Sequence, residues 1–248
     1  MGLRRILGSA RRSILCSLHQ RSIPLRVPGP FVSFTFDDFP RSAYTTGGSI
    51  LKNFGVKGTY YVSMGLMDTT TELGEQFHMD DLVSAAAEGH ELASHTFSHQ
   101  SSRRVSLEAF QNDVRSGQHA IQKFKSLAAT GNFAYPRGEV TLAAKSAVGK
   151  QMQSCRGIYG GVNGPTLDLN LLRANSLYGD MECLDAARQL IEQNNVQKSW
   201  LIFYTHDVQP TPSEYGCTPG FLESVVRIAV KDSSQVLPVA EVLALQAV

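Results

Sequence analysis

The sequence has few cysteines and almost no tryptophan. Among its 248 residues, Trp200 is the only tryptophan, and there are four cysteines, Cys16, Cys155, Cys183 and Cys217. These cysteines are far apart and form no Cys-x-x-Cys pair, which argues against a disulfide-stapled fold and against a cysteine zinc cluster. We therefore expect reduced thiols, and a chain of this length is typical of one large α/β domain.

The sequence also lacks long apolar runs and an even distribution of charge. Its longest apolar stretch is too short to span a bilayer, and no apolar segment ends in a small-residue cleavage site, so export is not expected. Residues 1–30 contain six arginines and no acid, which leaves 17 basic and 22 acidic residues in the rest of the chain. Nucleic-acid binding is not expected, because the folded body would carry a net negative charge.

Residues 1–30 are interpreted as a basic N-terminal extension. Its apolar residues recur at helical spacing between the arginines (Leu3, Ile6, Leu7, Ala10, Ile14, Leu15 and Leu18). One interpretation is a frayed or lightly docked extension. Another is a basic amphipathic helix that contacts an anionic membrane through residues 1–25, and an organelle transit peptide would also suit the composition. We expect a cytoplasmic protein, at the inner face of a membrane if the amphipathic helix binds there.

From residue 31 onward, short β-rich runs alternate with helical patterns. Strands are expected at 31–36, 57–63, 90–94, 131–135, 153–159, 171–178, 200–205 and 235–237. Helices are expected at 42–54, 79–88, 106–126, 139–149, 181–194 and 218–231, with Ser106 as the N-cap of the longest. This alternation predicts an α/β fold in which one domain, residues 31–248, forms a closed or nearly closed barrel of parallel strands.

The residues that could bind a metal or transfer a proton come directly after predicted strands or close behind them. Asp37 and Asp38 end an apolar strand, and His95, His99 and His206 each come shortly after another. Parallel α/β folds place their sites at the carboxyl ends of the strands, so we expect these side chains to share one rim. A carboxylate and two imidazoles could hold a divalent metal ion and leave a coordination position for water.

Each of these residues also has an ordinary structural interpretation. The two aspartates could cap a helix or form a turn before Pro40. His95 and His99 are four residues apart, so a helical turn would place both imidazoles on one face, although one could be a core histidine. The sequence has no His-Glu-x-x-His motif, so a general base must come from elsewhere, and Asp37 is the expected supplier. His206 is the natural general acid of a hydrolase, or a core histidine.

Together these segments resemble the polysaccharide deacetylase family, the NodB-homology domain. Residues 35–38 (Thr-Phe-Asp-Asp) resemble its first motif and residues 95–99 (His-Thr-Phe-Ser-His) its second. Residues 133–138 (Phe-Ala-Tyr-Pro-Arg-Gly) resemble the third motif and residues 204–206 (Tyr-Thr-His) the fifth. The resemblance covers roughly residues 31 to 240, and it implies a deformed (β/α) barrel of about seven parallel strands.

The resemblance also implies roles for individual residues. It makes Asp37 the catalytic base, His206 the catalytic acid, and Asp38, His95 and His99 the ligands of a divalent metal, most commonly zinc, with cobalt, manganese or nickel as alternatives. The backbone N–H after Pro136, that of Arg137, would help to hold the oxyanion. The implied activity is metal-dependent hydrolysis of an N-acetyl or O-acetyl group on a sugar.

Two departures from the family pattern concern charged partners. The third motif usually has an arginine where this chain has Ala134, and that arginine orients the catalytic aspartate. Arg137 and Arg173 are candidates for its replacement, and we favour Arg173 as the partner of Asp37, with an ordinary surface ion pair as the alternative. No Asp-Trp fourth motif is found, so the carboxylate partner of His206 is unassigned, with Asp180 and Asp185 as candidates.

Substrate contacts are expected from residues near the strand ends (Tyr135, Pro136, Tyr159, Asn163 and Tyr215), although the same loops could be plain solvent loops. The expected partner is an acetylated sugar or an intracellular or lipid-linked glycan precursor. Hydrolysis of another C–N bond, such as that of a cyclic ureide, is a second hypothesis. A catalytically silent carbohydrate-binding domain is a third, from a different functional class.

Overall fold

The computed structural model describes residues 13–27, 29–124, 129–232 and 234–246. Its strands are β1 (Ser22–Pro24), β2 (Phe31–Asp38), β3 (Thr59–Val62), β4 (Thr70–Thr71), β5 (Gly74–Glu75), β6 (Glu91–Ser94), β7 (Ala129–Ala134), β8 (Ser154–Arg156), β9 (Thr166–Asp168), β10 (Asn175–Ser176), β11 (Trp200–Thr205) and β12 (Gln235–Val236). Its α-helices are α2 (Ser49–Asn53), α3 (Met79–Ala87), α4 (Leu107–Gln122), α5 (Leu142–Gly149), α6 (Leu184–Gln197), α7 (Pro219–Lys231) and α8 (Val239–Gln246). None of the helices in these ranges is both long enough and apolar enough to cross a membrane.

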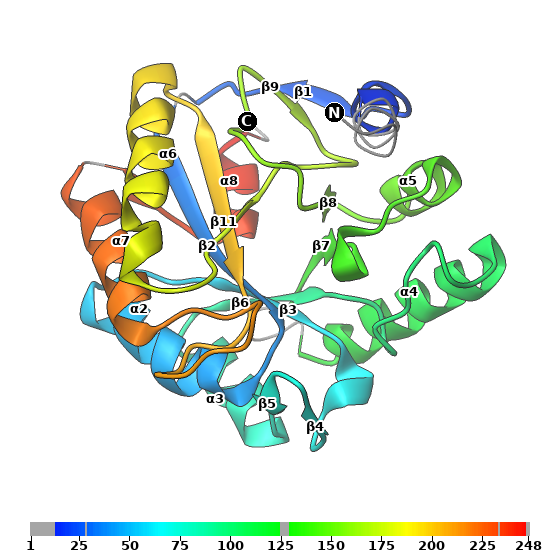
Figure 1. The fold of residues 1–248 in the computed structure, drawn as a ribbon. Coiled ribbons are helices and arrows are strands. Elements are labelled where there is room, and N and C mark those ends of the chain that lie inside the picture. Colours follow the sequence, from blue (N-terminus) through cyan, green and yellow to red (C-terminus); the bar gives the residue numbers. More distant parts are fainter. Residues whose placement is uncertain (1–12, 28, 125–128, 233, 247–248) are drawn as a thin grey trace, which may run out of the picture.

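The strands form a curled parallel sheet with helices around it, as Figure 1 shows. The strand order is β10-β11-β2-β3-β6-β7-β8, and β12 pairs with β2 beside this path. The two edges approach each other at an irregular seam, where Arg156 and Leu172 form an isolated parallel bridge. The deformed (β/α) barrel is therefore confirmed, although the strand expected at 171–178 is reduced to the two residues of β10.

The sequence of β2 explains its central position. All eight of its residues are buried, and it pairs with both β11 and β3. Because side chains alternate across a strand, Phe34 and Phe36 pack in the core cluster that includes residues of α2, α3 and α7. Ser33 and Thr35 face the other way and donate hydrogen bonds to the carbonyls of Leu237 and Phe203. Asp37 continues this second, polar row.

Helix α8, which the sequence did not predict, closes the end of the barrel opposite the carboxyl ends of the strands. Its residues Val239, Val242 and Leu243 pack with Phe31 and Trp200, which begin β2 and β11. A buried carboxylate at the start of β6 ties this end together. Glu91 accepts hydrogen bonds from the side chains of Thr59, Thr130 and Asn132 and from the backbone N–H of Ala240.

The described part of the N-terminal extension is packed against the barrel. Residues 13–17 are helical, Leu15 is 2% exposed, and β1 pairs antiparallel with β9. The fully buried ammonium of Lys145 donates to the Leu15 carbonyl at 2.7 Å and pairs with Asp168, also at 2.7 Å. The first part of the predicted amphipathic helix, residues 1–12, lies outside the described residues. Membrane contact and a cytoplasmic location stay predictions.

The predicted helices agree with the structure better than the predicted strands. Ser106 caps α4, since its hydroxyl accepts a hydrogen bond from the Ala109 N–H at 3.2 Å. The helix expected at 42–54 begins instead with a π-helical segment, η1 (Ala43–Gly48), which continues into α2. The hairpin of β4 and β5 was not predicted, and it reaches the rim where the strands end.

Candidate metal and catalytic site

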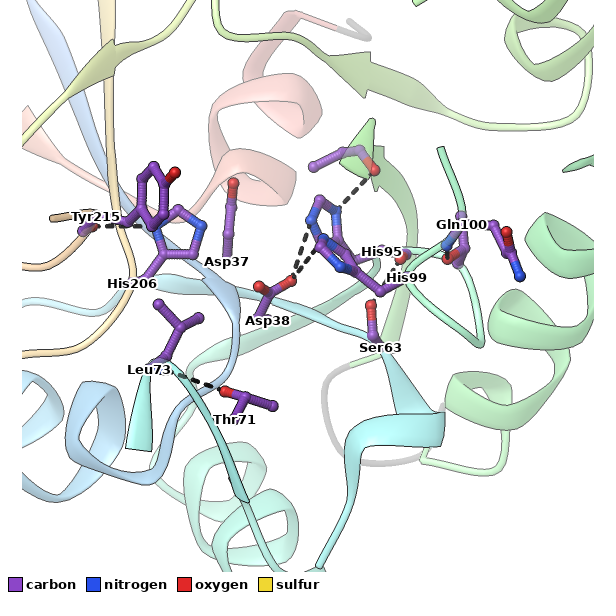
Figure 2. A network of polar contacts seen from close by, with 12 residues as sticks. Asp37, Asp38, Ser63, Thr71, Leu73, His95, His99, Gln100, His206 and Tyr215 are labelled. Carbon is purple, nitrogen blue, oxygen red and sulfur yellow. Dashed lines mark hydrogen bonds and ion pairs between the residues drawn. The ribbon is translucent and has the colours of Figure 1, made fainter. Parts of the chain in front are cut away.

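A pocket of about 300 Å³ opens at the carboxyl ends of the strands. It is lined by Asp37, Asp38, Glu72, Leu73, His99, Arg137, Gly138, Ile158, Tyr178, Tyr204, His206 and Tyr215. Figure 2 shows the two carboxylates between His95 and His99 on one side and His206 on the other. The strand ends therefore bring the predicted aspartates and histidines into one place.

Backbone geometry allows two consecutive aspartates to face the same pocket. In a regular strand, neighbouring side chains point to opposite faces of the sheet. Here Asp38 and Phe39 have φ angles of +64° and +68°, in the left-handed region that few non-glycine residues adopt. The strand ends at this point, so Asp38 turns toward the pocket while Asp37 keeps the inward orientation of β2. Both carboxylates are almost fully buried.

The two histidines lie on a loop, so the prediction of a helical turn was wrong. Residues 95–100 have no helical assignment, and Thr96 and His99 have φ angles of +66° and +53°. The loop is held by α4, whose Asp113 accepts hydrogen bonds from the Ser98 N–H. Gly117 of α4 permits this close approach, because a Cβ there would lie 2.4 Å from the carbonyl carbon of Thr96.

Three ligand atoms converge in this corner. The Oδ1 atom of Asp38 lies 3.4 Å from Nε2 of His95 and 3.1 Å from Nε2 of His99. Nδ1 of His95 lies 2.9 Å from the carbonyl oxygen of Ala134, which can only accept, so Nδ1 carries the proton and Nε2 presents its lone pair to Asp38. Within the described ranges, Asp38, His95 and His99 form the one cluster of three such side chains able to hold a metal ion.

The protonation states of the histidines favour a cation between them and Asp38. Burial lowers the pKa of His95 to about 4, against a smaller opposing effect of Asp37 and Asp38, and burial also lowers the pKa of His99. Both imidazoles are therefore neutral at pH 7. Asp38 Oδ1 is buried and has no hydrogen-bond donor among the described residues. A buried carboxylate oxygen that faces the lone pair of His95 and a second neutral imidazole, with no hydrogen-bond donor, is unfavourable unless a positive ion lies between them, so these three residues fit a divalent metal.

Asp37 is paired with a buried arginine, and that arginine is Arg156 at the end of β8. Nη2 of Arg156 donates to Asp37 Oδ1, and Nη1 donates to the Gly157 carbonyl at 3.0 Å. The guanidinium lies 4.7 Å from the ring centre of Tyr61 and 5.1 Å from that of Tyr204. Burial by itself would raise the pKa of Asp37, but Arg156, assisted by His95 and His206, lowers it below its ordinary value. Asp37 is therefore ionised at neutral pH.

The prediction that Arg173 pairs with Asp37 was wrong. Arg173 is exposed and donates from Nη1 to the Gly160 carbonyl at 3.0 Å. It precedes β10, whose Asn175 is in register with Phe203 of β11, and Phe203 is in register with Phe34 of β2. The Arg173 side chain is therefore used on the loop backbone outside the barrel, and Arg156 is the arginine that pairs with Asp37.

His206 is half-buried at the end of β11 and makes no ion pair with a carboxylate in the described structure. Its Nδ1 lies 3.1 Å from the carbonyl oxygen of Tyr215, and its ring contacts the rings of Tyr178 and Tyr215. The backbone carbonyl of Tyr215 thus occupies the position for which the sequence indicated a carboxylate.

The residues predicted to bind substrate are not gathered at the pocket. Tyr215 lines the pocket, and so does Arg137. Arg137 directly follows Pro136 and has a φ angle of +59°. Tyr135 is 1% exposed and packs with Phe133 in the core, which contradicts a role as a sugar platform. Pro136 is buried, and Tyr159 packs at the edge of the same core cluster.

Asn163 lies at the other end of the barrel from the pocket. It is buried, and its side chain exchanges hydrogen bonds with the backbone of Arg173 and donates to the carbonyl of Trp200, the first residue of β11. Its amide is used to pair two segments of backbone, which contradicts a role in substrate binding.

Other lining residues were missed in the sequence. Glu72 and Leu73 come from the β4–β5 hairpin, and Leu73 is only 5% exposed although it lies near the hairpin tip. The hairpin is anchored at its base by His78, whose ring nitrogens contact Asp68 at 2.5 Å and Glu75 at 2.9 Å. A strand of two residues has no readable alternation, so no periodic signal marks this hairpin.

Comparisons with known proteins agree with this architecture. A family model described as polysaccharide deacetylase matches residues 25–156, more than half of the chain. Among curated proteins, no sequence matches. A family 4 acetyl xylan esterase from Clostridium thermocellum, solved with a cobalt ion, has 20% identity and a TM-score of 0.58, and the match covers 87% of this chain and 91% of that one.

Two further solved structures are similar. A chitin deacetylase from Colletotrichum lindemuthianum has 16% identity and a TM-score of 0.55, over 87% of this chain and 88% of that one. A peptidoglycan deacetylase from Bacillus subtilis has 16% identity and a TM-score of 0.53, over 90% and 94%. At these identities the similarity concerns the fold.

Proposed function

Because the chain belongs to the polysaccharide deacetylase family, we propose that it is a metal-dependent hydrolase that removes an acetyl group, N-linked rather than O-linked, from a carbohydrate. One observation carries this proposal. Two members of a candidate metal triad (Asp38 and His99), an ionised carboxylate held by a buried arginine, and a histidine with a fixed ring orientation all border one pocket, and His95, the third member, is buried beside it. These are the groups that metal-assisted amide hydrolysis requires.

Asp38, His95 and His99 would hold the metal. One oxygen and two nitrogen ligands, which would leave a coordination position for water, are typical of a catalytic zinc site, and zinc is the metal we propose. A divalent ion bound there would polarise the acetyl carbonyl and lower the pKa of the attacking water. The hydrogen bond from His95 Nδ1 to the Ala134 carbonyl fixes the ring for this role.

Asp37 would accept the proton of the attacking water. It borders the pocket beside Asp38, and Arg156 keeps it ionised at neutral pH. His206 would protonate the departing amine from its Nε2 atom. The backbone N–H of Arg137 would stabilise the oxyanion, a contact worth about 2.7–4 kcal/mol in comparable sites.

The pocket walls suit a sugar. The rings of Tyr178, Tyr204 and Tyr215 offer apolar faces with polar edges, and Glu72 and Arg137 can hydrogen-bond hydroxyl groups. A volume of about 300 Å³ is at the lower end of the range for small-molecule sites, which suits one sugar ring at a time. We therefore propose an N-acetylated sugar or glycan precursor as the substrate.

Acetate release tests the proposal. The zinc-loaded protein is incubated with N-acetylated and O-acetylated oligosaccharides, and free acetate is measured for the wild type, Asp37→Asn and His206→Ala. We expect each variant to lose about 10²–10⁴ in kcat while its metal content is unchanged. Asp80→Asn and His119→Ala, at exposed helix positions, are the matched controls and should retain activity. Normal turnover by Asp37→Asn, or no acetate from any substrate, would contradict the proposal.

A further inference from the structure

His206 is oriented by a backbone carbonyl. Its Nδ1 lies 3.1 Å from the Tyr215 oxygen, and its own backbone N–H donates to the same oxygen at 3.2 Å. A carbonyl oxygen can only accept, so Nδ1 must carry a proton in the neutral ring as well as in the charged ring. The other nitrogen, Nε2, is left as the atom that gains and loses the proton.

The position of that carbonyl depends on the loop between His206 and α7. Asp207, the residue after the histidine, is fully buried, and its carboxylate accepts hydrogen bonds from the loop itself. The donors are the Ser213 N–H at 2.9 Å, the Ser213 hydroxyl at 2.5 Å and the Gln209 side-chain amide at 2.8 Å. The Ser213 hydroxyl oxygen in turn accepts from the Tyr215 N–H at 3.2 Å. A continuous chain of contacts thus runs from Asp207 through Ser213 to Tyr215 and back to His206.

The end of the loop is fixed against the same aspartate. The Cys217 N–H donates to the Asp207 carbonyl at 2.9 Å, which returns the chain to the end of β11. Gly216 allows this return, because a Cβ at this position would lie 2.3 Å from Asp207 Oδ1. The loop from Asp207 to Cys217 is therefore folded around one buried carboxylate.

We propose that Asp207 is a positioning residue for His206, which it orients through the 207–217 loop and the Tyr215 carbonyl without touching substrate. The proposal rests on the proposed function of His206 as the general acid. In that step the imidazolium gives its Nε2 proton to the amine nitrogen as the carbon–nitrogen bond breaks, and a neutral ring protonated on Nδ1 remains. The Tyr215 carbonyl matches this product tautomer, so the ring neither rotates nor exchanges its Nδ1 proton during turnover.

The test reads the tautomer directly and the kinetics separately. Nitrogen-15 NMR of the zinc-loaded protein, with His206 assigned by comparison with His206→Gln, reports which ring nitrogen is protonated in the neutral state. We expect the Nδ1–H form in the wild type and a mixture of tautomers in Asp207→Asn. In the acetate-release assay we expect Asp207→Asn to lower kcat by about 10- to 100-fold, with KM changed by less than about twofold.

Two further variants keep the test decisive. Ser213→Ala retains the buried carboxylate and removes the link to Tyr215, so it should show the same change even if Asp207→Asn does not fold. Asp232→Asn, an exposed residue at the end of α7, is the matched control and should behave as wild type. An Nε2–H tautomer in the wild type, or an unchanged tautomer and kcat in both loop variants, would overturn the proposal. The predicted tautomer in a protein that releases no acetate would support the positioning and contradict the proposed function.

Discussion

Replacement of Arg156 by methionine tests the buried pair at the centre of the site. Arg156 is 1% exposed and is the one hydrogen-bonded cation beside Asp37 in the described structure. Removal of one partner of a buried ion pair typically costs about 3–5 kcal/mol, because the other charge is left uncompensated. For a chain of this length each kcal/mol corresponds to about 2–4 °C, so the midpoint of thermal unfolding should fall by about 6–20 °C.

The loss of stability should depend on pH. In the wild type the pKa of Asp37 is lowered, so its stabilising contribution is present at neutral pH and is lost only as the pH falls through that lowered value. Without the guanidinium, burial raises the pKa of Asp37, and the cost of keeping it ionised is greatest at neutral pH. The difference in stability between wild type and Arg156→Met should therefore narrow as the pH falls from 7 toward 4.

Urea denaturation at several pH values, with a chelator present throughout, measures both effects. The double variant Asp37→Asn with Arg156→Met removes both charges and should recover most of the lost stability at pH 7. Arg173→Met is the matched control, because Arg173 is exposed, and it should change the free energy of unfolding by less than about 0.5 kcal/mol. A loss below about 1 kcal/mol for Arg156→Met, or a loss that does not vary with pH, would refute the reasoning.

Three further predictions concern other parts of the molecule. His95→Ala should abolish stoichiometric zinc binding in equilibrium dialysis, whereas the exposed His119→Ala should retain it; equal binding would exclude His95 as a ligand. Because burial lowers the pKa of His95 to about 4 and also lowers that of His99, zinc should still bind at pH 6, and weak binding there would argue against the neutral imidazoles. In Glu91→Gln an NH2 group replaces one carboxylate oxygen, so two of the four hydrogen-bond donors at the closed end of the barrel lose their acceptor. The free energy of unfolding should fall by about 2–4 kcal/mol in urea denaturation.

Much of the fold and of the site could be predicted because the signals are local. An apolar strand that ends in two aspartates is readable in the sequence, and the carboxyl-end rule then brings Asp37, Asp38 and the histidines together. The helices with a clear apolar face, such as α4, were placed close to their observed limits. The short spacing of His95 and His99 correctly predicted that the two rings lie together. Residues with left-handed φ angles, and not a helical turn, bring them together.

The partner of Asp37 could not be predicted from local patterns. Arg156 and Arg173 were each the one arginine in a predicted strand, so no local pattern favoured the buried one. The choice depends on the seam, where residues 171–174 are irregular and Arg173 turns outward. Similarly, a carboxylate was expected beside His206, and the Tyr215 carbonyl could not be predicted in its place. The position of that carbonyl depends on the return of the 207–217 loop, which requires the close contact between Asp207 and Gly216.

The docked N-terminal segment limits how the chain can be shortened. A protein that started at residue 26 would lose β1, the strand paired with β9, and would leave the buried Lys145 without the Leu15 carbonyl. If that protein did not bind lipid vesicles, the loss of these packing contacts would explain the result as well as the loss of a membrane-binding helix would. Deletion of residues 1–12 alone preserves these contacts, so this is the variant that separates an effect on membrane attachment from an effect on folding.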